Sequence, residues 1–195
     1  MSVEEYLALD TDPLVKYEYL NGVIVAMAGA SPRHNQVASN LGHRLNAAFE
    51  ARPCHVLGSD QRVYVAETGS YVCPDLTVVC DKPRFTDDRP RALLNPRLIV
   101  EVLSASTRDH DQGAKVRHYR KMPSVREVLL VDANVRHAEL WRRLETGQWL
   151  LTDVTDGGID LESVGVRLEL DEVYAKTDEL PFDPADEAPT QSARS

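Results

Sequence analysis

The sequence predicts a mixed α/β domain, on the strength of its size, its composition and the order of its apolar segments. The chain has 195 residues, of which 43% are hydrophobic and 27% charged, values typical of a soluble globular protein with one full core. Short apolar runs of strand length are interspersed with helical patterns, and no internal repeat is visible. No apolar run is long enough for a membrane span, so we expect no membrane association.

The first elements are a short helix and a hairpin. Ser2 and Glu5 form a capping-box pattern, which predicts a helix over residues 3–9. Asn21-Gly22 divides the apolar segment 16–27, and this dipeptide favours the tight turn of a β-hairpin.

Ser31-Pro32 predicts the start of the next helix, because serine is a favoured N-cap and proline a favoured first residue. Val37, Leu41, Leu45 and Ala48 fall on one stripe of this helix. His34 lies at the N-terminal end of the same stripe. We therefore expect this stripe to face the core.

The remaining elements follow from apolar runs and their punctuation. Three strand segments come first, and a polar, proline-rich loop over 81–96 separates the second from the third. A helix that Pro123 ends follows them. The predicted strands are 54–66, 71–80, 97–103, 126–132, 136–143 and 148–154, the helix is 113–122, and 166–175 ends the fold.

We predict one domain over residues 1–182 and a disordered acidic tail over 183–195. Residues 153–195 hold 12 acidic and 3 basic residues, whereas 82–126 holds 11 basic and 5 acidic. A nucleic-acid partner is therefore compatible with the chain despite its net charge of −9. The three cysteines, Cys54, Cys73 and Cys80, show no CxxC spacing, which favours reduced thiols and a cytoplasmic location.

Two acidic residues lie inside apolar strands. Glu101 is flanked by apolar residues in 97–103, and Asp75 directly follows Pro74 in 71–80. Two carboxylates on neighbouring central strands repel each other and lose solvation, and a shared divalent cation removes both costs. Oxygen ligands suit Mg²⁺ or Mn²⁺. The alternative is that Asp75 caps a turn and Glu101 pairs with an arginine.

The spacing of these acids resembles the PD-(D/E)xK nuclease superfamily, although the lysine expected two residues after the second acid is replaced by Leu103. The run "EVLSASTRDHDQGAKVRHY" closely resembles one family of restriction-endonuclease type, which we call Uma-two. There the lysine has moved to the following helix, and the matching position here is Lys115. The likeness extends over about residues 3–143, and Ala105 stands where the family often has proline.

The resemblance implies a restriction endonuclease-like fold, in which helices flank a central mixed sheet, with an N-terminal helix and hairpin and extra C-terminal strands. It implies a metal-dependent endonuclease acting on DNA, with Asp75, Glu101 and the Val102 carbonyl holding Mg²⁺ or Mn²⁺ and Lys115 stabilising negative charge. It also implies a homodimer.

Further candidates are less specific. Glu18 matches an acid common in the family, and it could join the site or lie on the surface; His34 could contact phosphate or simply belong to the core boundary. Gln61 is a further polar candidate. Basic residues that could contact the DNA backbone are Arg108, Arg117, Arg120 and Lys121. The competing hypothesis is a catalytically inactive nuclease fold that acts as an interaction or dimerisation module.

Overall fold

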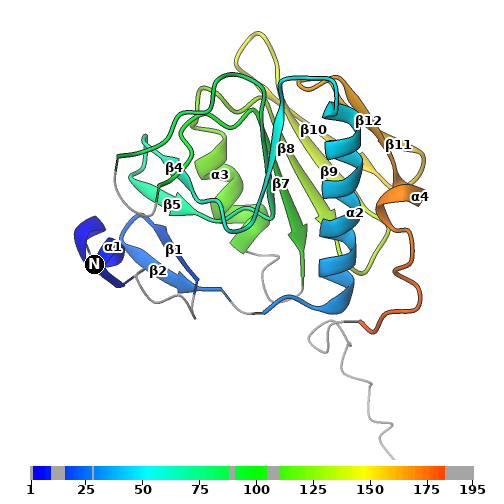
Figure 1. The fold of residues 1–195 in the computed structure, drawn as a ribbon, viewed down its shortest axis with the longest axis horizontal. Coiled ribbons are helices and arrows are strands. Elements are labelled where there is room, and N and C mark those ends of the chain that lie inside the picture. Colours follow the sequence, from blue (N-terminus) through cyan, green and yellow to red (C-terminus); the bar gives the residue numbers. More distant parts are fainter. Residues whose placement is uncertain (1, 10–15, 28, 88–90, 105–109, 183–195) are drawn as a thin grey trace, which may run out of the picture.

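The computed structural model describes residues 2–9, 16–27, 29–87, 91–104 and 110–182. Its centre is a six-stranded mixed sheet in the order β10-β9-β8-β7-β6-β3 (Figure 1). Only β7 and β8 are parallel, and the other neighbours in this sheet are antiparallel. The predicted mixed α/β class with a central mixed sheet is confirmed. The strands are β3 (His55–Gly58), β6 (Leu76–Val79), β7 (Leu98–Leu103), β8 (Glu127–Asp132), β9 (Ala138–Arg143) and β10 (Trp149–Val154).

Two smaller sheets flank this centre. A four-stranded sheet has the order β2-β1-β5-β4, and β11 and β12 form a two-stranded hairpin. The bounds are β1 (Tyr17–Leu20), β2 (Val23–Ala26), β4 (Val63–Val65), β5 (Ser70–Val72), β11 (Gly158–Leu161) and β12 (Val166–Glu169). The strand β11 was not predicted.

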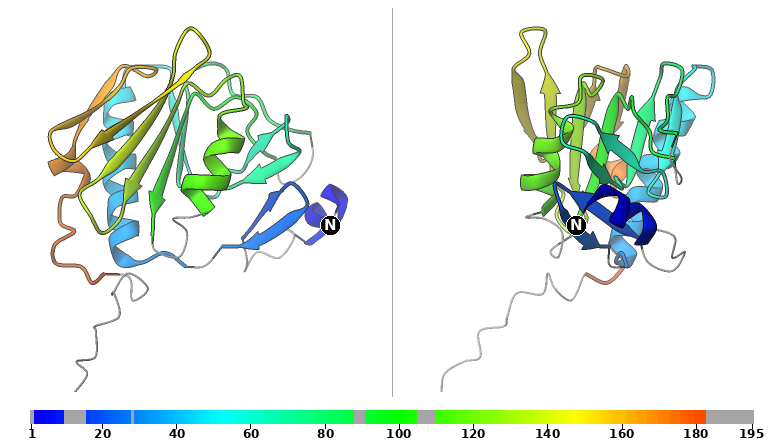
Figure 2. Two further views of the ribbon diagram at one scale, coloured as in Figure 1. Left: turned by 180° about the vertical axis from the view of Figure 1, so that it is seen from behind. Right: turned by 90° about the vertical axis from the view of Figure 1, so that its left-hand side faces the viewer.

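The helices lie on both faces of the central sheet. Figure 2 shows α2 (Pro32–Phe49) on one face and α3 (Val116–Tyr119) on the other. The π-helix η1 (His110–Lys115) runs directly into α3, and together they supply the crossover that the parallel pair β7–β8 requires. The remaining helices are α1 (Val3–Leu9) and α4 (Leu170–Val173).

Local sequence signals explain the N-terminal elements. The Ser2 N–H donates to Glu5 Oε2 at 2.7 Å, and the Glu5 N–H donates to Ser2 Oγ at 3.2 Å, as a capping box requires. Asn21 and Gly22 have φ values of 49° and 92°, which fits the predicted hairpin turn. The Ser31 hydroxyl accepts the N–H of His34 and caps α2.

Two predicted strands are each divided between two sheets. The segment 54–66 forms β3 and β4, and the segment 71–80 forms β5 and β6. Pro74 stands at the second division, where it has no N–H to offer a ladder. The chain leaves the small sheet after Val72 and enters the central sheet at Leu76, so Asp75 lies directly before β6.

Two apolar clusters hold the layers together. The first joins α2, α4 and the β11–β12 hairpin to one face of the central sheet, and the second joins α3 to the other face. Val37, Leu41 and Leu45 are buried in the first cluster as predicted, but Phe49 rather than the exposed Ala48 completes the stripe. On β7, Ile99 and Leu103 belong to the second cluster, so Glu101 faces α3.

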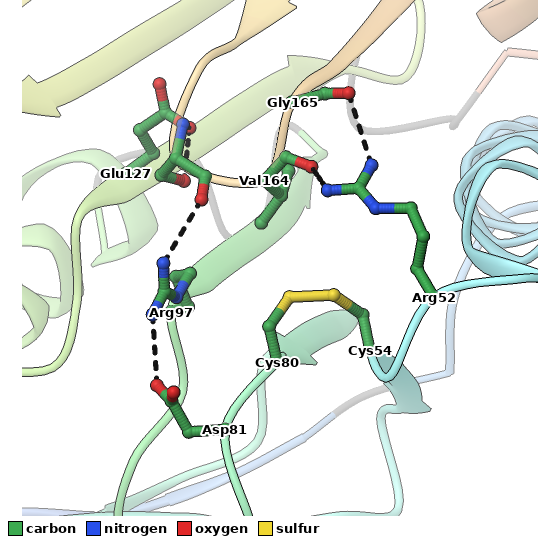
Figure 3. The surroundings of a disulfide bond; sticks show 9 residues. Arg52, Cys54, Cys80, Asp81, Arg97, Glu127, Val164 and Gly165 are labelled. Carbon is green, nitrogen blue, oxygen red and sulfur yellow. Dashed lines mark hydrogen bonds and ion pairs between the residues drawn. A yellow bond between two sulfur atoms is a disulfide. The ribbon is translucent and has the colours of Figure 1, made fainter.

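Cys54 and Cys80 form a disulfide (Figure 3), so the prediction of three reduced thiols is wrong for this pair. The two residues flank the antiparallel pair His55 and Val79, and the register therefore places them opposite each other. Cys73 is a buried free thiol, as predicted. The cysteine argument for a cytoplasmic location therefore no longer holds.

None of the described helices has both the length and the hydropathy that crossing a membrane requires. The predicted tail, 183–195, lies outside the described residues. The predicted extent of the domain, residues 1–182, stays a prediction.

Candidate active site

The ammonium group of Lys115 lies between two buried carboxylates. Its Nζ is 2.7 Å from Glu101 Oε1 and 2.9 Å from Glu18 Oε1, and each of the three side chains is at most 3% exposed. The three residues come from η1, β7 and β1. The structure therefore brings together three predicted site residues that are far apart in the sequence.

The position of Lys115 follows from the crossover that returns over β7. Lys115 and Tyr119 are four residues apart at the junction of η1 and α3, and both contact Glu101. The Tyr119 hydroxyl donates to Glu101 Oε1 at 2.5 Å. Leu103, where the superfamily pattern places lysine, is buried in the apolar cluster beneath α3. Lys115, from the following helix, therefore contacts the acid that the superfamily pattern combines with a lysine on the same strand.

Glu18 is fixed by the segment that precedes Asp75. The Cys73 N–H donates to Glu18 Oε1 at 2.7 Å, so one carboxylate oxygen receives both a backbone donor and the Lys115 ammonium. With formal charges, Glu18, Glu101 and Lys115 sum to −1. A buried group of this kind favours an additional cation.

Asp75 reaches the same region through the backbone of β7. Its Oδ2 accepts the Val102 N–H at 2.7 Å and lies 3.3 Å from His34 Nε2. The Asp75 and His34 side chains are 15% and 13% exposed, so both retain limited access to solvent. The antiparallel pairing of β6 with β7 ends at Leu76 and Val100. Extending this register by one residue places Asp75 opposite Glu101.

The donor chemistry of Asp75 and Glu101 fits a hard divalent cation, because both offer carboxylate oxygens, Glu101 from β7 and Asp75 from the residue before β6. In the described part of the chain, however, neither residue lies in a cluster of three or more His, Cys, Asp or Glu residues whose ligand atoms all fall within 4.8 Å of one another. Lys115 and Tyr119 both contact Oε1 of Glu101. The contact of Val102 with the site is its N–H, and the metal role of its carbonyl stays a prediction.

Burial controls the protonation of two groups beside the site. Burial and the Glu101 carboxylate hold the pKa of Tyr119 well above its ordinary value, so the hydroxyl stays a donor. Burial and the Glu18 carboxylate raise the pKa of the Cys73 thiol to about 12, which keeps it protonated and unreactive.

The remaining candidates lie elsewhere or outside the described residues. Gln61 Nε2 donates to the Arg62 and Arg91 carbonyl oxygens at 3.0 Å, so its recorded contacts are with loop backbone. Arg108 lies outside the described residues. The hydrogen bond from Tyr119 to Glu101 was not predicted, although its i, i+4 spacing from Lys115 is visible in the sequence.

Comparison with solved structures finds a similar fold. The chain resembles a crystal structure described as "a putative nuclease belonging to DUF820" from Anabaena variabilis ATCC 29413, with a TM-score of 0.72 and 16% identity over 89% of this chain and 97% of that chain. At this identity the likeness concerns the fold.

A family model named Uma2 and described as "Putative restriction endonuclease" matches residues 3–171. The chain belongs to this family, as the sequence motifs predicted. It is 35% identical to "Uncharacterized protein sll1609" of Synechocystis sp. over 83% of this chain and 92% of that protein. It is 33% identical to "Uncharacterized protein slr1290" of the same organism over 89% and 91%.

Proposed function

We propose that the protein is a metal-dependent endonuclease with a restriction endonuclease-like fold that hydrolyses DNA phosphodiester bonds. The observation that carries this proposal is the contact of Lys115 with Glu101, at 2.7 Å, beside Asp75, which directly precedes the neighbouring strand β6. Family membership supports the same activity.

Asp75 and Glu101 are the residues that would hold Mg²⁺ or Mn²⁺. The bound ion would supply Lewis acidity toward the phosphate and lower the pKa of water. His34 positions the Asp75 carboxylate from α2, and the Val102 N–H fixes it from β7. These two contacts restrict Asp75 to one orientation, which a coordination site requires.

Lys115 would stabilise the negative charge that develops on the phosphate oxygens as water attacks phosphorus and the ester P–O bond breaks. Glu18 holds the ammonium group in place, and Tyr119 orients the carboxylate that Lys115 contacts. Because these groups are buried and preorganised, little reorganisation is needed during the reaction.

A basic surface at the C-terminal end of α3 would contact the DNA backbone. The Arg120 guanidinium lies 5.0 Å from the Trp141 ring centroid, and that of Arg143 lies 4.8 Å from the Trp149 centroid. Burial and the positive charges of Arg126 and Arg120 lower the pKa of Arg143. Phosphate would relieve this repulsion between like charges.

The salt dependence of binding tests this surface. We expect Arg126→Gln, at an exposed position, to weaken binding of a DNA duplex in EDTA and to reduce the slope of log K against log salt by about 1. Arg167→Gln is the matched control, because Arg167 already pairs with Asp160 and Glu169 away from this surface. Equal slopes in both variants would exclude Arg126 as a phosphate contact.

Cleavage of plasmid and branched DNA with Mg²⁺ or Mn²⁺ tests the activity. We expect Asp75→Ala, Glu101→Ala and Lys115→Ala to abolish cleavage, while Arg167→Ala, which removes an exposed arginine on β12 away from the basic surface, retains it. Circular dichroism would establish that each variant is folded. Wild-type cleavage that all three site variants retain would contradict the mechanism.

One observation favours a second candidate, a nuclease fold that acts as a non-catalytic interaction module. Lys115 is 2% exposed and contacts two carboxylates, so its ammonium is already neutralised. Calorimetric binding of Mg²⁺ that Asp75→Ala removes would argue against this candidate. The homodimer stays a prediction, which sedimentation velocity would test.

A further inference from the structure

A second cluster of possible metal ligands lies at the open end of the β9–β10 hairpin. The ligand atoms of His137, Glu139 and Asp153 all lie within 4.8 Å of one another. His137 Nε2 is 3.0 Å from Asp153 Oδ1. None of these residues contributes to the Lys115 site described above.

The sheet fixes the relative position of the three side chains. Glu139 and Asp153 are directly paired in the antiparallel register of β9 and β10. His137 precedes Glu139 by two residues, so its side chain lies on the same face as Glu139 in extended chain. Directly opposed carboxylates repel each other, and a shared cation removes that repulsion.

The backbone of His137 is held from both sides. Its N–H donates to the Tyr174 hydroxyl at 3.2 Å, and its carbonyl accepts the Asp132 N–H at 3.0 Å. The same hydroxyl donates to the Asp132 carbonyl at 2.7 Å, which ties the end of α4 to the end of β8. The imidazole therefore projects from an anchored segment, as a preorganised ligand should.

We propose that His137, Glu139 and Asp153 form a binding site for a first-row transition-metal ion of the Zn²⁺ type. One imidazole nitrogen with two carboxylates suits Zn²⁺ or a similar ion better than Mg²⁺, which prefers oxygen alone. Ligands about 2.0–2.1 Å from a tetrahedral ion lie roughly 3.3 Å apart. The His137–Asp153 separation of 3.0 Å is already close to that value.

Flexible, accessible side chains can make the remaining adjustment of the ligand positions. Asp153 is 66% exposed and His137 28%, so both can move by the small distance needed, and water can complete the coordination. The ion would join β9 to β10, the edge strand of the central sheet. Its expected effect is therefore to stabilise this hairpin.

This site is separate from the proposed catalytic site, although both lie on the same face. Glu101 pairs with Leu130, and Leu130 pairs with Glu139, so two strand spacings, roughly 10 Å, separate Glu101 from Glu139. The inference does not depend on nuclease activity, and a failure of either proposal leaves the other intact.

The test is calorimetric titration of untagged, EDTA-treated protein with ZnCl₂ in the presence of excess Mg²⁺, together with thermal melting. We expect one equivalent of Zn²⁺ and a higher Tm in the wild type, and loss of both effects in His137→Gln and Asp153→Asn. His43→Gln, at an exposed position on α2 on the opposite face of the sheet, and Glu101→Gln should retain them. Circular dichroism in EDTA would check that the variants are folded.

Two outcomes would overturn the proposal. One is a wild type that binds no Zn²⁺ under these conditions. The other is a Zn²⁺ equivalent that persists in both His137→Gln and Asp153→Asn, because the ion would then be bound elsewhere.

Discussion

Glu101 and Glu127 are buried glutamates on the neighbouring strands β7 and β8, but their surroundings differ. The Glu127 carboxylate accepts from Arg142 Nε at 2.7 Å, from the N–H groups of Glu162 and Ser163 at 3.1 Å, and from the Ser163 hydroxyl at 2.5 Å. Figure 3 shows it beside the loop that carries Val164. Glu127 thus holds the β11–β12 hairpin against the sheet, and its acceptors are used by structural donors.

Glu101 instead contacts a lysine and a tyrosine of the crossover helices. Its contacts are the Lys115 ammonium and the Tyr119 hydroxyl, and Asp75 contacts the next residue of β7. The comparison teaches that a buried glutamate in an apolar strand does not define a site. What distinguishes Glu101 from Glu127 is its contact with a lysine and the presence of a second acid directly before the adjacent strand.

The largest expected effects come from removing each glutamate in turn. Glu101→Ala should reduce DNA cleavage by at least about 10²–10³-fold, the range for losing one electrostatic contributor to a transition state. Glu127→Ala should lower the free energy of unfolding by about 3 kcal/mol, because it leaves Arg142 Nε and the Glu162 and Ser163 donors without their acceptor. Urea unfolding and cleavage assays on both variants would measure these effects.

An exchange of the effects on cleavage and on stability between the two variants would contradict this distinction. Full cleavage by folded Glu101→Ala would show that Glu101 has been assigned to the site wrongly. Abolished cleavage by Glu127→Ala that remains folded at the assay temperature would show the same.

A smaller effect is expected at His34, which contacts Asp75 without being a proposed metal ligand. His34→Ala should weaken Mg²⁺ or Mn²⁺ binding by about 10–100-fold, as for other residues that orient a metal ligand. Calorimetric titration would measure the change, with His43→Ala, an exposed histidine on the same helix, as the control. Unchanged affinity would limit His34 to a packing role.

The smallest effect concerns Tyr119, the hydroxyl donor to Glu101. Loss of this hydrogen bond in Tyr119→Phe should cost about 1.5 kcal/mol near neutral pH. Because the folded-state pKa is raised, the contribution of Tyr119 is complete below its unfolded value of 10.0 and falls as the pH rises above it.

Urea unfolding from pH 8 to 11 would test this prediction. Wild-type stability should fall more steeply above pH 10 than that of Tyr119→Phe, and equal slopes would show that Tyr119 ionises equally in both states.

The sequence predicted the elements whose signals are local. The capping box at Ser2, the turn at Asn21-Gly22 and the start of α2 at Ser31 all depend on residues within a few positions of each other. The division of 71–80 into β5 and β6 was not predicted, because strand pairing is a long-range choice that a continuous apolar run does not reveal.

The same distinction applies to the candidate site. The family motif placed Lys115 on the helix after β7, and its contact with Glu101 agrees with that prediction. The disulfide of Cys54 and Cys80 depends on the pairing of β3 with β6, which spacing alone could not supply. The structural role of Glu127 likewise depends on a hairpin distant in sequence.

The proposed mechanism rests on the claim that Asp75 and Glu101 hold one divalent ion beside Lys115. Anomalous scattering from a crystal soaked with Mn²⁺ tests this claim. We predict a peak within about 2.0–2.3 Å of carboxylate oxygens from both Asp75 and Glu101. Mn²⁺ found only at His137, Glu139 and Asp153, or bound at neither place, would contradict the claim.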